Sequence, residues 1–439
     1  MSNKLTTSRR DFLRGSLVAG AGAALASQLS VARTAHAAGS DEMKAVLIGC
    51  GGRGRGAAYN CIKADKGVKI IAVADAFERQ SKDTARFMRN SEEFAGRIDL
   101  PDDRVFFGLD AYAKAIACDP DLVLIATPPG FRPQQYSAAI KAGKHVFMEK
   151  PVCVDAPGYN IVVEANKLAD EKGLKVGVGL QRHHQQSYIE TMKRIHDGAL
   201  GDIQFLRAYW NGDGIWTRGR EPGMTEMQYQ VHNWYHFTWV SGDNICEQHV
   251  HNLDVCNWVM NDHPVEANGM GGCSRRYLGD KRGTGQIFDH HFVEFTYKNG
   301  TKMYSQCRHM QGTWGNVSEA AHGTKGESNC AGWIKAAEEW RFRGEGADPY
   351  DQEHVDLLAA IRKDEKYNEG WFGATSSFTA VLGRMATYSG QIVKWDDAVK
   401  QGKSKFPQEL TWDAPAPEQK NADGDYAIAV PGVTSPYDA

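Results

Sequence analysis

The sequence predicts an α/β protein that starts with a doubly wound parallel sheet and continues into an α+β region with a large, open, mostly antiparallel sheet. A glycine-rich turn follows the apolar run 45–48, and apolar strands alternate with polar helical stretches up to about residue 180. Alternation of this kind indicates a parallel sheet with helices on both faces. After residue 200, apolar and polar residues alternate within strands, which indicates antiparallel pairing.

The glycine-rich turn lies at residues 44–54, Lys-Ala-Val-Leu-Ile-Gly-Cys-Gly-Gly-Arg-Gly. Gly49 allows a tight turn, Gly51 lets the backbone approach a pyrophosphate, and Gly54 lets the next helix pack closely on the strand. The N-terminus of that helix offers free N–H groups to phosphates. The pattern predicts a dinucleotide site in a Rossmann domain, with cofactor contacts from Gly49, Gly51, Gly52, Arg53 and Gly54.

A second apolar strand over 68–74 leads into Asp75, which lies 21 residues after Gly54. A carboxylate at this place can accept both ribose hydroxyls of an adenosine, and it repels a 2′-phosphate. Asp75 therefore favours NAD over NADP, while Arg79 argues for NADP.

The rest of the N-terminal domain, predicted over 41–182, continues the alternation. Residues 91–105 are predicted to be a loop. Further strands are expected at 121–126, 145–148 and 175–180, and helices at 78–90, 134–142 and 157–171.

The second domain is predicted over 183–400. Its strands at 288–297 and 301–309 are joined at Asn299-Gly300, and Asn-Gly between alternating strands predicts a hairpin. Another strand is expected at 203–210, and helices at 352–363 and 376–395. Residues 401–439 are rich in proline, glycine and acidic residues, and are expected to wrap the surface or a neighbouring subunit.

Residues 1–37 are predicted to be a twin-arginine signal peptide. Arg9 and Arg10 precede an apolar stretch over 15–25, and Ala35-His36-Ala37 offers a cleavage site. The apolar stretch is too short to span a membrane. The mature protein is therefore expected in the periplasm, exported folded. Because soluble NAD is scarce there, the NAD is expected to be tightly bound.

Charge and cysteine content exclude several classes of protein. The formal net charge is −3, and removal of residues 1–37 would remove five basic residues and one acidic residue. This argues against nucleic acid or an anionic membrane as the main partner. The nine cysteines form no C-x-x-C pair, so a disulfide framework is not expected. No metal is predicted, because neither H-E-x-x-H nor a cysteine–histidine ligand spacing occurs.

Several motifs, in this order, resemble the Gfo/Idh/MocA oxidoreductase family: the glycine-rich turn, Ala74-Asp75, Ala126-Thr127-Pro128, Glu149-Lys150-Pro151, His251-x-x-Asp254 and Gly323-x-x-Gly326. The resemblance covers about 44–400. It implies a Rossmann domain, an open-sheet second domain that favours a homodimer or homotetramer, and a sugar or polyol substrate between the domains. The family includes inositol and glucose dehydrogenases, exported glucose–fructose oxidoreductases and NAD-dependent glycosidases.

The resemblance implies that Lys150 is catalytic and that Pro151 commonly takes a cis bond that aims it. A lysine at the carboxyl end of a parallel strand can exchange a proton with a sugar hydroxyl near the nicotinamide. The alternative is a surface lysine before a turn. Thr127, Pro128, Glu149 and Arg182 are expected near the cofactor.

Residues 246–254 form the second candidate catalytic stretch. On one helix, Glu247, His251 and Asp254 would share a face, where the imidazole can remove a hydroxyl proton and the carboxylates can hold the substrate. The family usually has Asp at 247 and a small residue at 249, so Glu247 and His249 are departures that would reshape the substrate pocket. The alternative is that His251 is a hydrogen-bonded helix residue.

Two further features are predicted to bind substrate. Arg132 stands where family members often have histidine, and a guanidinium suits an anionic or heavily hydroxylated ligand; it can equally be a surface group. The stretch 208–239 is rich in aromatic residues, of which Trp234 is a candidate for stacking on a sugar ring, although such residues more often form core or subunit interface.

Three functions follow from these observations. The first is an NAD-dependent oxidoreductase that acts on a sugar, polyol or glycoside. The second is a redox-neutral NAD-dependent glycoside hydrolase or lyase that passes through a transient ketosugar. The third is a sugar-binding protein without catalytic activity.

Overall fold

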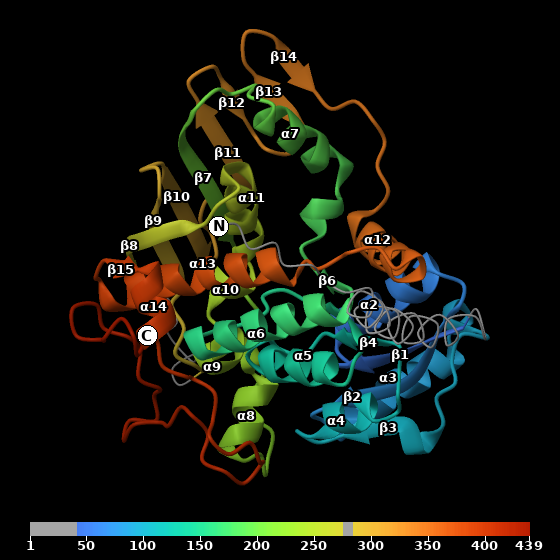
Figure 1. Ribbon diagram of the computed structural model, residues 1–439. Helices are drawn as coiled ribbons and strands as arrows, with labels where there is room; N and C mark the ends of the chain where they lie inside the picture. Colours follow the sequence, from blue (N-terminus) through green and yellow to red (C-terminus); the bar gives the residue numbers. More distant parts are fainter. Residues whose placement is uncertain (1–41, 275–283) are drawn as a thin grey trace, which may run out of the picture. The chain divides into compact units, whose positions relative to one another are not determined.

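A six-stranded sheet forms the N-terminal part of the protein, in the order β3-β2-β1-β4-β5-β6 (Figure 1). The computed structural model describes residues 42–274 and 284–439, so the predicted signal peptide lies outside the described residues. The pairs β1–β4, β2–β3, β4–β5 and β5–β6 are parallel, which confirms the doubly wound sheet. The strands are β1 Met43–Ile48, β2 Val68–Asp75, β3 Val105–Phe107, β4 Leu122–Ile125, β5 His145–Met148 and β6 Val176–Val178.

The predicted loop at 91–105 is more structured than expected. It contains two short 3-10 turns, Glu92–Phe94 and Asp102–Arg104, and β3 begins at its last residue. β3 has only three residues and pairs with the outer edge of β2. A strand this short leaves no periodic signal in the sequence, so only the pairing reveals it.

Helices pack on this sheet in two groups. The helices that follow the strands in the sequence are α2 Gly52–Ala64, α3 Glu78–Asn90, α4 Ala111–Ile116, α5 Arg132–Lys141 and α6 Ala156–Lys172. α4, α5 and α6 contact one another, whereas α2 contacts α12 Pro349–Lys363 (Figure 1). Because α12 follows most strands of the second sheet in the sequence, the chain returns to the first sheet at α12.

A nine-stranded sheet follows, in the order β14-β13-β12-β11-β7-β10-β9-β8-β15. Only β7 and β10 pair in parallel, which confirms a mostly antiparallel sheet. The predicted hairpin joins β9 and β10, with Gly300 at φ +88° in the turn. The strands are β7 Ile203–Gly212, β8 Pro264–Gly272, β9 His290–Tyr297, β10 Lys302–His309, β11 Asn316–Gly323, β12 Glu327–Ser328, β13 Trp333–Lys335, β14 Glu339–Arg341 and β15 Val393–Lys394.

One face of this sheet is covered by helices. Alternate strand residues such as Leu206, Val293 and Met303 join Leu253 and Phe378 of the helices in one apolar core. The residues between them on β9 and β10 are half-buried, so the other face is open. The helices of this region are α7 Gln186–His196, α8 Glu226–His232, α9 Thr238–Ser241, α10 Asn244–Glu247, α11 Val250–Met260, α13 Gly370–Ser389 and α14 Trp395–Gln401.

The last long helix is shifted from its predicted range of 376–395. α13 covers Gly370–Ser389 and ends at Gly390, which takes φ +68°. A glycine in the left-handed region is a common helix stop, because it carries no Cβ. The sequence prediction extended the helix across this stop, so its C-terminal boundary is wrong.

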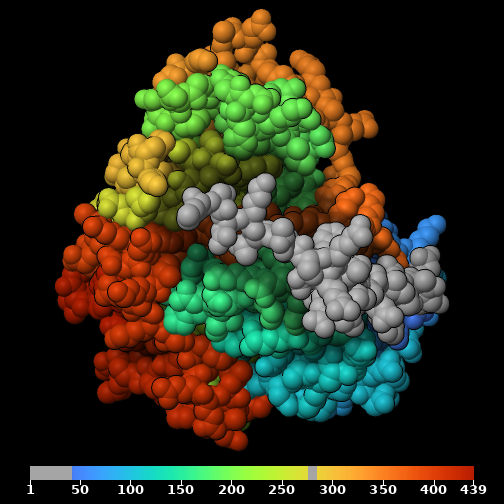
Figure 2. All heavy atoms as spheres, viewed as in Figure 1, coloured from blue at the N-terminus to red at the C-terminus, as the bar shows by residue number. Residues whose placement is uncertain are grey.

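Residues after α14 have little regular structure but pack on the rest of the chain. Phe406 and Tyr426 belong to an apolar cluster with Phe131 and Trp239. In Figure 2 the red C-terminal residues form a continuous surface beside the green of α6, in line with the hydrogen bond from the Lys405 N–H to Asp155. Among the described residues, no helix has both the length and the apolar composition that a membrane crossing requires.

A buried histidine links the end of the first sheet to α12. His184 Nδ1 lies 2.6 Å from Asp356 Oδ2 and Nε2 lies 3.0 Å from Glu369 Oε1. Burial alone would lower the pKa of His184, but the hydrogen bonds to these two carboxylates raise it to about 10. The protonated imidazole therefore stabilises the folded state.

This pair of contacts predicts a pH-dependent stability. Because the folded pKa of about 10 lies above the unfolded value of about 6.5, the contribution of His184 is complete below about pH 6.5 and is lost as pH rises towards 10. We expect the midpoint of urea unfolding to fall as pH rises over this range, and we expect a smaller fall in His184→Gln. An equal fall of the midpoint with pH in His184→Gln would contradict the assignment.

Candidate active site

The glycine-rich turn is built as the pattern predicts. Gly49 takes φ +99°, and a Cβ there would overlap the backbone of Ala126. A Cβ on Gly54 would overlap the carbonyl oxygen of Gly49. By contrast, a Cβ on Gly51 or Gly52 would meet no atom within 4 Å, because both face open space. The turn thus needs glycine for its own packing and leaves room for a ligand.

The N-terminus of α2 opens onto this space. Its N-cap is Gly51, so no side chain caps the first N–H groups, and its first turn holds no acidic residue. Free N–H groups and the positive end of the helix dipole suit an anion. The turn and the helix end therefore fit the pyrophosphate of a dinucleotide.

Asp75 lies at the carboxyl end of β2, on the same cavity. Its carboxylate accepts N–H groups of Cys50 (2.8 Å) and Phe77 (2.9 Å), which fixes its orientation. Burial raises the pKa of Asp75, although these backbone bonds oppose the rise. Arg79, which the sequence analysis weighed as evidence for NADP, is highly exposed and pairs with Asp83 at 3.6 Å.

One cavity of about 580 Å³ joins the dinucleotide region to the second domain. Its walls come from the glycine-rich turn, from the carboxyl ends of β2, β4 and β5, from α10 and α11, and from Trp210 of β7. The sheet order reverses between β1 and β4, and ligands of doubly wound sheets bind where the order reverses. Thr127 and Pro128 line the wall after β4, and Thr127 Oγ1 lies 2.6 Å from Gln135 Oε1.

Lys150 lies just after β5, where the Lys150–Pro151 peptide bond is cis. Its Nζ donates a hydrogen bond to the carbonyl oxygen of Glu247 (2.5 Å) and lies 3.3 Å from Glu247 Oε1. Both side chains are largely buried and line the cavity. The structure therefore brings together two predicted catalytic residues that are 97 positions apart in the sequence.

The environment of Glu247 is polar but enclosed. Burial raises the pKa of Glu247, and the positive charges of Lys150 and Arg132 oppose that rise. Arg132 is also buried, donates to the carbonyl oxygen of Pro151 (2.6 Å) and lines the cavity. Glu247 Oε2 has no hydrogen-bond partner within residues 42–274 and 284–439. A buried carboxylate oxygen that lacks a partner can accept a hydrogen bond from a ligand hydroxyl.

His251 lies beside this pair, near the start of α11. Its Nδ1 has no hydrogen-bond partner in the part of the chain that the structure describes. Burial, followed by the charges of Lys150 and Arg182, holds the pKa of His251 well below its usual range, so the imidazole is neutral. The indole ring of Trp210 lies parallel to it with 6.0 Å between ring centres.

A helix break changes the predicted arrangement of 246–254. α10 ends at Glu247 and α11 starts at Val250, so Glu247 and His251 do not share one continuous helix. Neither His249 nor Asp254 lines the cavity. His249 is fully buried and lies 2.7 Å from Ser305 on the sheet. Asp254 lies 2.8 Å from His183 and accepts a hydrogen bond from Ser376 (2.7 Å).

Arg182, Arg53 and Glu149 line the cavity and belong to buried ion-pair networks. Arg182 pairs with Glu319 of β11, which also accepts hydrogen bonds from Asn252 (2.5 Å) and Tyr188 (3.1 Å). Arg53 pairs with Glu149 and, at 3.0 Å, with Glu353 of α12. Glu319 and Glu353 were not predicted from the sequence, because no local motif surrounds either of them.

Trp234 also lines the cavity, on the side of the dinucleotide region. Its ring lies 5.6 Å from Trp216, which carries Arg218 above its face. Arg218 and Gln248 also line the wall, although neither was predicted from the sequence. Among residues 42–274 and 284–439, no group of three or more histidine, cysteine or acidic side chains is arranged to hold a metal ion.

Comparison with known proteins agrees with this architecture. Inositol 2-dehydrogenase of Klebsiella pneumoniae (strain 342) is 26% identical over 220 residues, 50% of this chain and 55% of the relative. scyllo-Inositol 2-dehydrogenase (NADP(+)) IolW of Bacillus subtilis (strain 168) is 35% identical over 113 residues, 26% of this chain and 30% of the relative. The chain thus spans about half the length, or less, of these curated relatives.

Solved structures extend the similarity of fold over both sheets. Aldose-aldose oxidoreductase from Caulobacter crescentus superposes with a TM-score of 0.61 at 16% identity, over 80% of this chain and 99% of that one. Apo scyllo-inositol dehydrogenase from Lactobacillus casei gives a TM-score of 0.60 at 19% identity, over 80% and 98%.

Two family models match the chain directly. Residues 6–26 match the TAT (twin-arginine translocation) pathway signal sequence, which indicates export by that route. Residues 43–180 match the oxidoreductase family with an NAD-binding Rossmann fold. Residues 43–180 therefore form the NAD-binding Rossmann domain of the Gfo/Idh/MocA oxidoreductase family, in a chain that also carries a twin-arginine signal.

Proposed function

We propose that this protein transfers a hydride between a bound nicotinamide dinucleotide and a carbinol carbon of a sugar, polyol or glycoside. One observation carries the proposal: Lys150, Glu247 and His251 meet on the same cavity as the glycine-rich turn. When bound there, the nicotinamide supplies the carbon that accepts or returns the hydride. The sugar-dehydrogenase names of the relatives agree with this class of substrate.

The chain's own residues supply the proton chemistry. Oxidation of a carbinol breaks its C–H and O–H bonds and forms a carbonyl, so the hydroxyl proton needs an acceptor. We assign that role to neutral His251, whose Nδ1 has no hydrogen-bond partner among the described residues and can accept the proton. Lys150 Nζ, which donates to the Glu247 carbonyl oxygen at 2.5 Å, also donates a hydrogen bond to the substrate hydroxyl and stabilises the negative charge that develops on its oxygen. In the reverse direction His251 returns the proton.

The remaining wall fits a hydroxylated ring. The unpartnered Glu247 Oε2 and His251 Nδ1 can bond to hydroxyl groups, and buried Arg132 adds a fixed positive charge. The indole of Trp210 offers a flat apolar face. We place the substrate between these groups and Lys150. His249 and Asp254, which lie away from the cavity, support the elements that carry the site.

Export and cofactor retention extend the proposal. The twin-arginine signal supports a periplasmic location for the folded protein. Asp75 can bind an uncharged ribose diol, which favours NAD over NADP. The NAD is bound tightly enough to be carried through export with the protein. The open face of the nine-stranded sheet supports a homodimer or homotetramer.

The purified protein, without added cofactor, tests this function against inositols, aldoses and aryl glycosides. We expect a polyol or aldose to raise the near-ultraviolet absorbance of reduced nicotinamide in one stoichiometric step. Release of aglycone without lasting reduction would replace the proposal with redox-neutral cleavage. Binding of the sugar without any change in absorbance, in protein shown to hold the dinucleotide, would favour a binding protein instead.

A further inference from the structure

Residues 213–236, here called the cover segment, leave the second sheet after β7 and reach the dinucleotide region. The segment includes α8 and contributes Trp216, Arg218 and Trp234 to the cavity wall. Within it, the ring of His232 lies 6.0 Å from the ring of Phe77, two residues after Asp75. The second domain therefore supplies part of the wall around the adenosine end of the site.

Arg218 is held in this wall by three contacts. Its backbone N–H donates to Asn233 Oδ1 (2.9 Å), and its Nη1 donates to the carbonyl oxygen of His232 (3.1 Å). Its guanidinium lies 4.4 Å from the centre of the Trp216 ring. Within the described residues, its other N–H groups form no hydrogen bond. Arg218 thus presents oriented donors on the cavity that Asp75 also lines.

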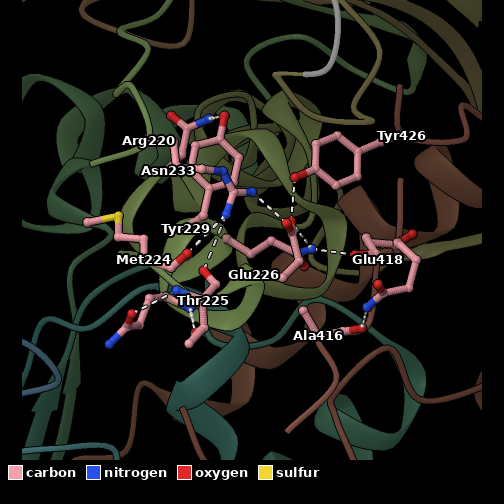
Figure 3. A network of polar contacts seen from close by, with 12 residues as sticks. Arg220, Met224, Thr225, Glu226, Tyr229, Asn233, Ala416, Glu418 and Tyr426 are labelled. Carbon is pink, nitrogen blue, oxygen red and sulfur yellow. Dashed lines mark hydrogen bonds and ion pairs between the residues drawn. The ribbon is translucent and has the colours of Figure 1, made fainter. Parts of the chain in front are cut away.

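The C-terminal residues fix the cover segment, as Figure 3 shows. Glu226 of α8 pairs with Arg220 at 2.5 Å and accepts a hydrogen bond from Tyr426. Thr225 Oγ1 donates to the carbonyl oxygen of Trp412 (2.7 Å), and the ring of Trp412 lies 5.3 Å from Phe77. Trp412 and Tyr426 of the C-terminal residues therefore hold α8 near Phe77, which follows β2. Arg218 is thereby ordered before a ligand binds, so binding does not carry the entropy cost of fixing it.

Asp75 and Arg218 line the same cavity with opposite charges. Burial raises the pKa of Asp75, and the positive charge of Arg218 is one of the effects that oppose the rise. Asp75 accepts backbone N–H groups at both of its oxygens, and a carboxylate offers about four lone-pair sites, so it can also accept ribose hydroxyls. A guanidinium donates to hydroxyl oxygens and binds phosphate by two parallel bonds. Next to a 2′-phosphate, the attraction by Arg218 would be opposed by the repulsion from Asp75. The pair as it stands fits an uncharged ribose diol.

We propose that Arg218 is a ribose-binding residue of the dinucleotide site and that Asp75 and Arg218 together decide cofactor preference. Asp75 accepts the ribose hydroxyls, while Arg218 donates to their oxygens from the cover segment. When the negative charge of Asp75 is removed, Arg218 can bind the 2′-phosphate of NADP without opposing repulsion. One substitution therefore converts the preference from NAD to NADP. The inference rests on the proposed dinucleotide site.

The test measures binding of NAD and NADP to the full chain, freed of cofactor, by calorimetry. The variants are Asp75→Ser, Arg218→Met and the double variant; methionine keeps an apolar stem over Trp216, so the fold is retained. We expect Arg218→Met to weaken NAD binding about tenfold. We expect Asp75→Ser to tighten NADP binding about tenfold or more, and Arg218→Met to abolish that gain.

Arg79→Met is the matched control, because Arg79 follows Asp75 closely but is exposed and pairs with Asp83. It should change neither affinity. If Asp75→Ser binds NADP equally well with and without Arg218, or if Arg218→Met leaves both affinities unchanged, the inference fails. If the unmodified protein binds neither dinucleotide, the proposed function itself fails, which is a separate outcome.

Discussion

Lys150→Met is expected to lower kcat by about 10²- to 10⁴-fold while the dinucleotide remains bound. Methionine has a similar length but cannot donate a hydrogen bond to the reacting hydroxyl or stabilise the negative charge that develops on its oxygen as the proton leaves. The neighbouring Glu247 is left without its cation, but burial already raises its pKa, so it can take up a proton and limit the loss of stability. We therefore expect a folded protein that retains its dinucleotide but has almost no activity.

The measurement combines single-turnover kinetics on the best substrate of the panel with the absorbance of the retained dinucleotide. Lys141→Met is the control, because Lys141 lies exposed at the last turn of α5. It should match the unmodified protein in kcat and in melting temperature. Unchanged kcat in Lys150→Met would remove Lys150 from the mechanism, whatever the cofactor content.

Gly54→Ala should have the second large effect, on folding and on cofactor binding together. The added Cβ would overlap the carbonyl oxygen of Gly49, so α2 must move away from β1. Overpacking of this kind costs about 1–3 kcal/mol, and more where backbone is the obstacle. The shift also displaces the helix end that faces the pyrophosphate. We expect a melting temperature several degrees lower and no retained dinucleotide.

Gly56→Ala gives a matched control on the same helix. A Cβ there would meet only Arg53 Nη1, at 3.4 Å, which is ordinary contact. Alanine in a helix interior is favoured over glycine by about 0.5–1 kcal/mol. We expect a slightly higher melting temperature and full cofactor content. If Gly54→Ala behaves like Gly56→Ala, the close packing of α2 on the strand does not require glycine.

The dinucleotide half of the site could be predicted from short stretches of sequence. Gly49, Gly51, Gly54 and Asp75 follow two neighbouring strands at their carboxyl ends, and the strands bring them together in any doubly wound sheet. Cys50 and Phe77 orient Asp75 through their backbone N–H groups. These contacts do not depend on the identity of the side chains, so the sequence does not reveal them.

The substrate half was predicted less completely. Residues 246–254 were considered as one helix, whereas the chain breaks between α10 and α11. The four-residue offset between Glu247 and His251 crosses this break, so helix spacing alone did not place them. His251 and Asp254 lie on the same helix α11, but Asp254 contacts His183 and Ser376 and does not line the cavity.

By itself, the sequence determined the two sheets, the glycine-rich turn, the Asp75 and Lys150 positions and the export signal, because each depends on residues close together in the chain. The tertiary structure alone decided the long-range pairs. Lys150 meets Glu247 across 97 residues, Arg182 meets Glu319 across 137 and Arg53 meets Glu353 across 300. Such pairs depend on strand register and on how α12 and the cover segment return to the first sheet. The hydrophobic periodicity of a short stretch of sequence does not predict that return.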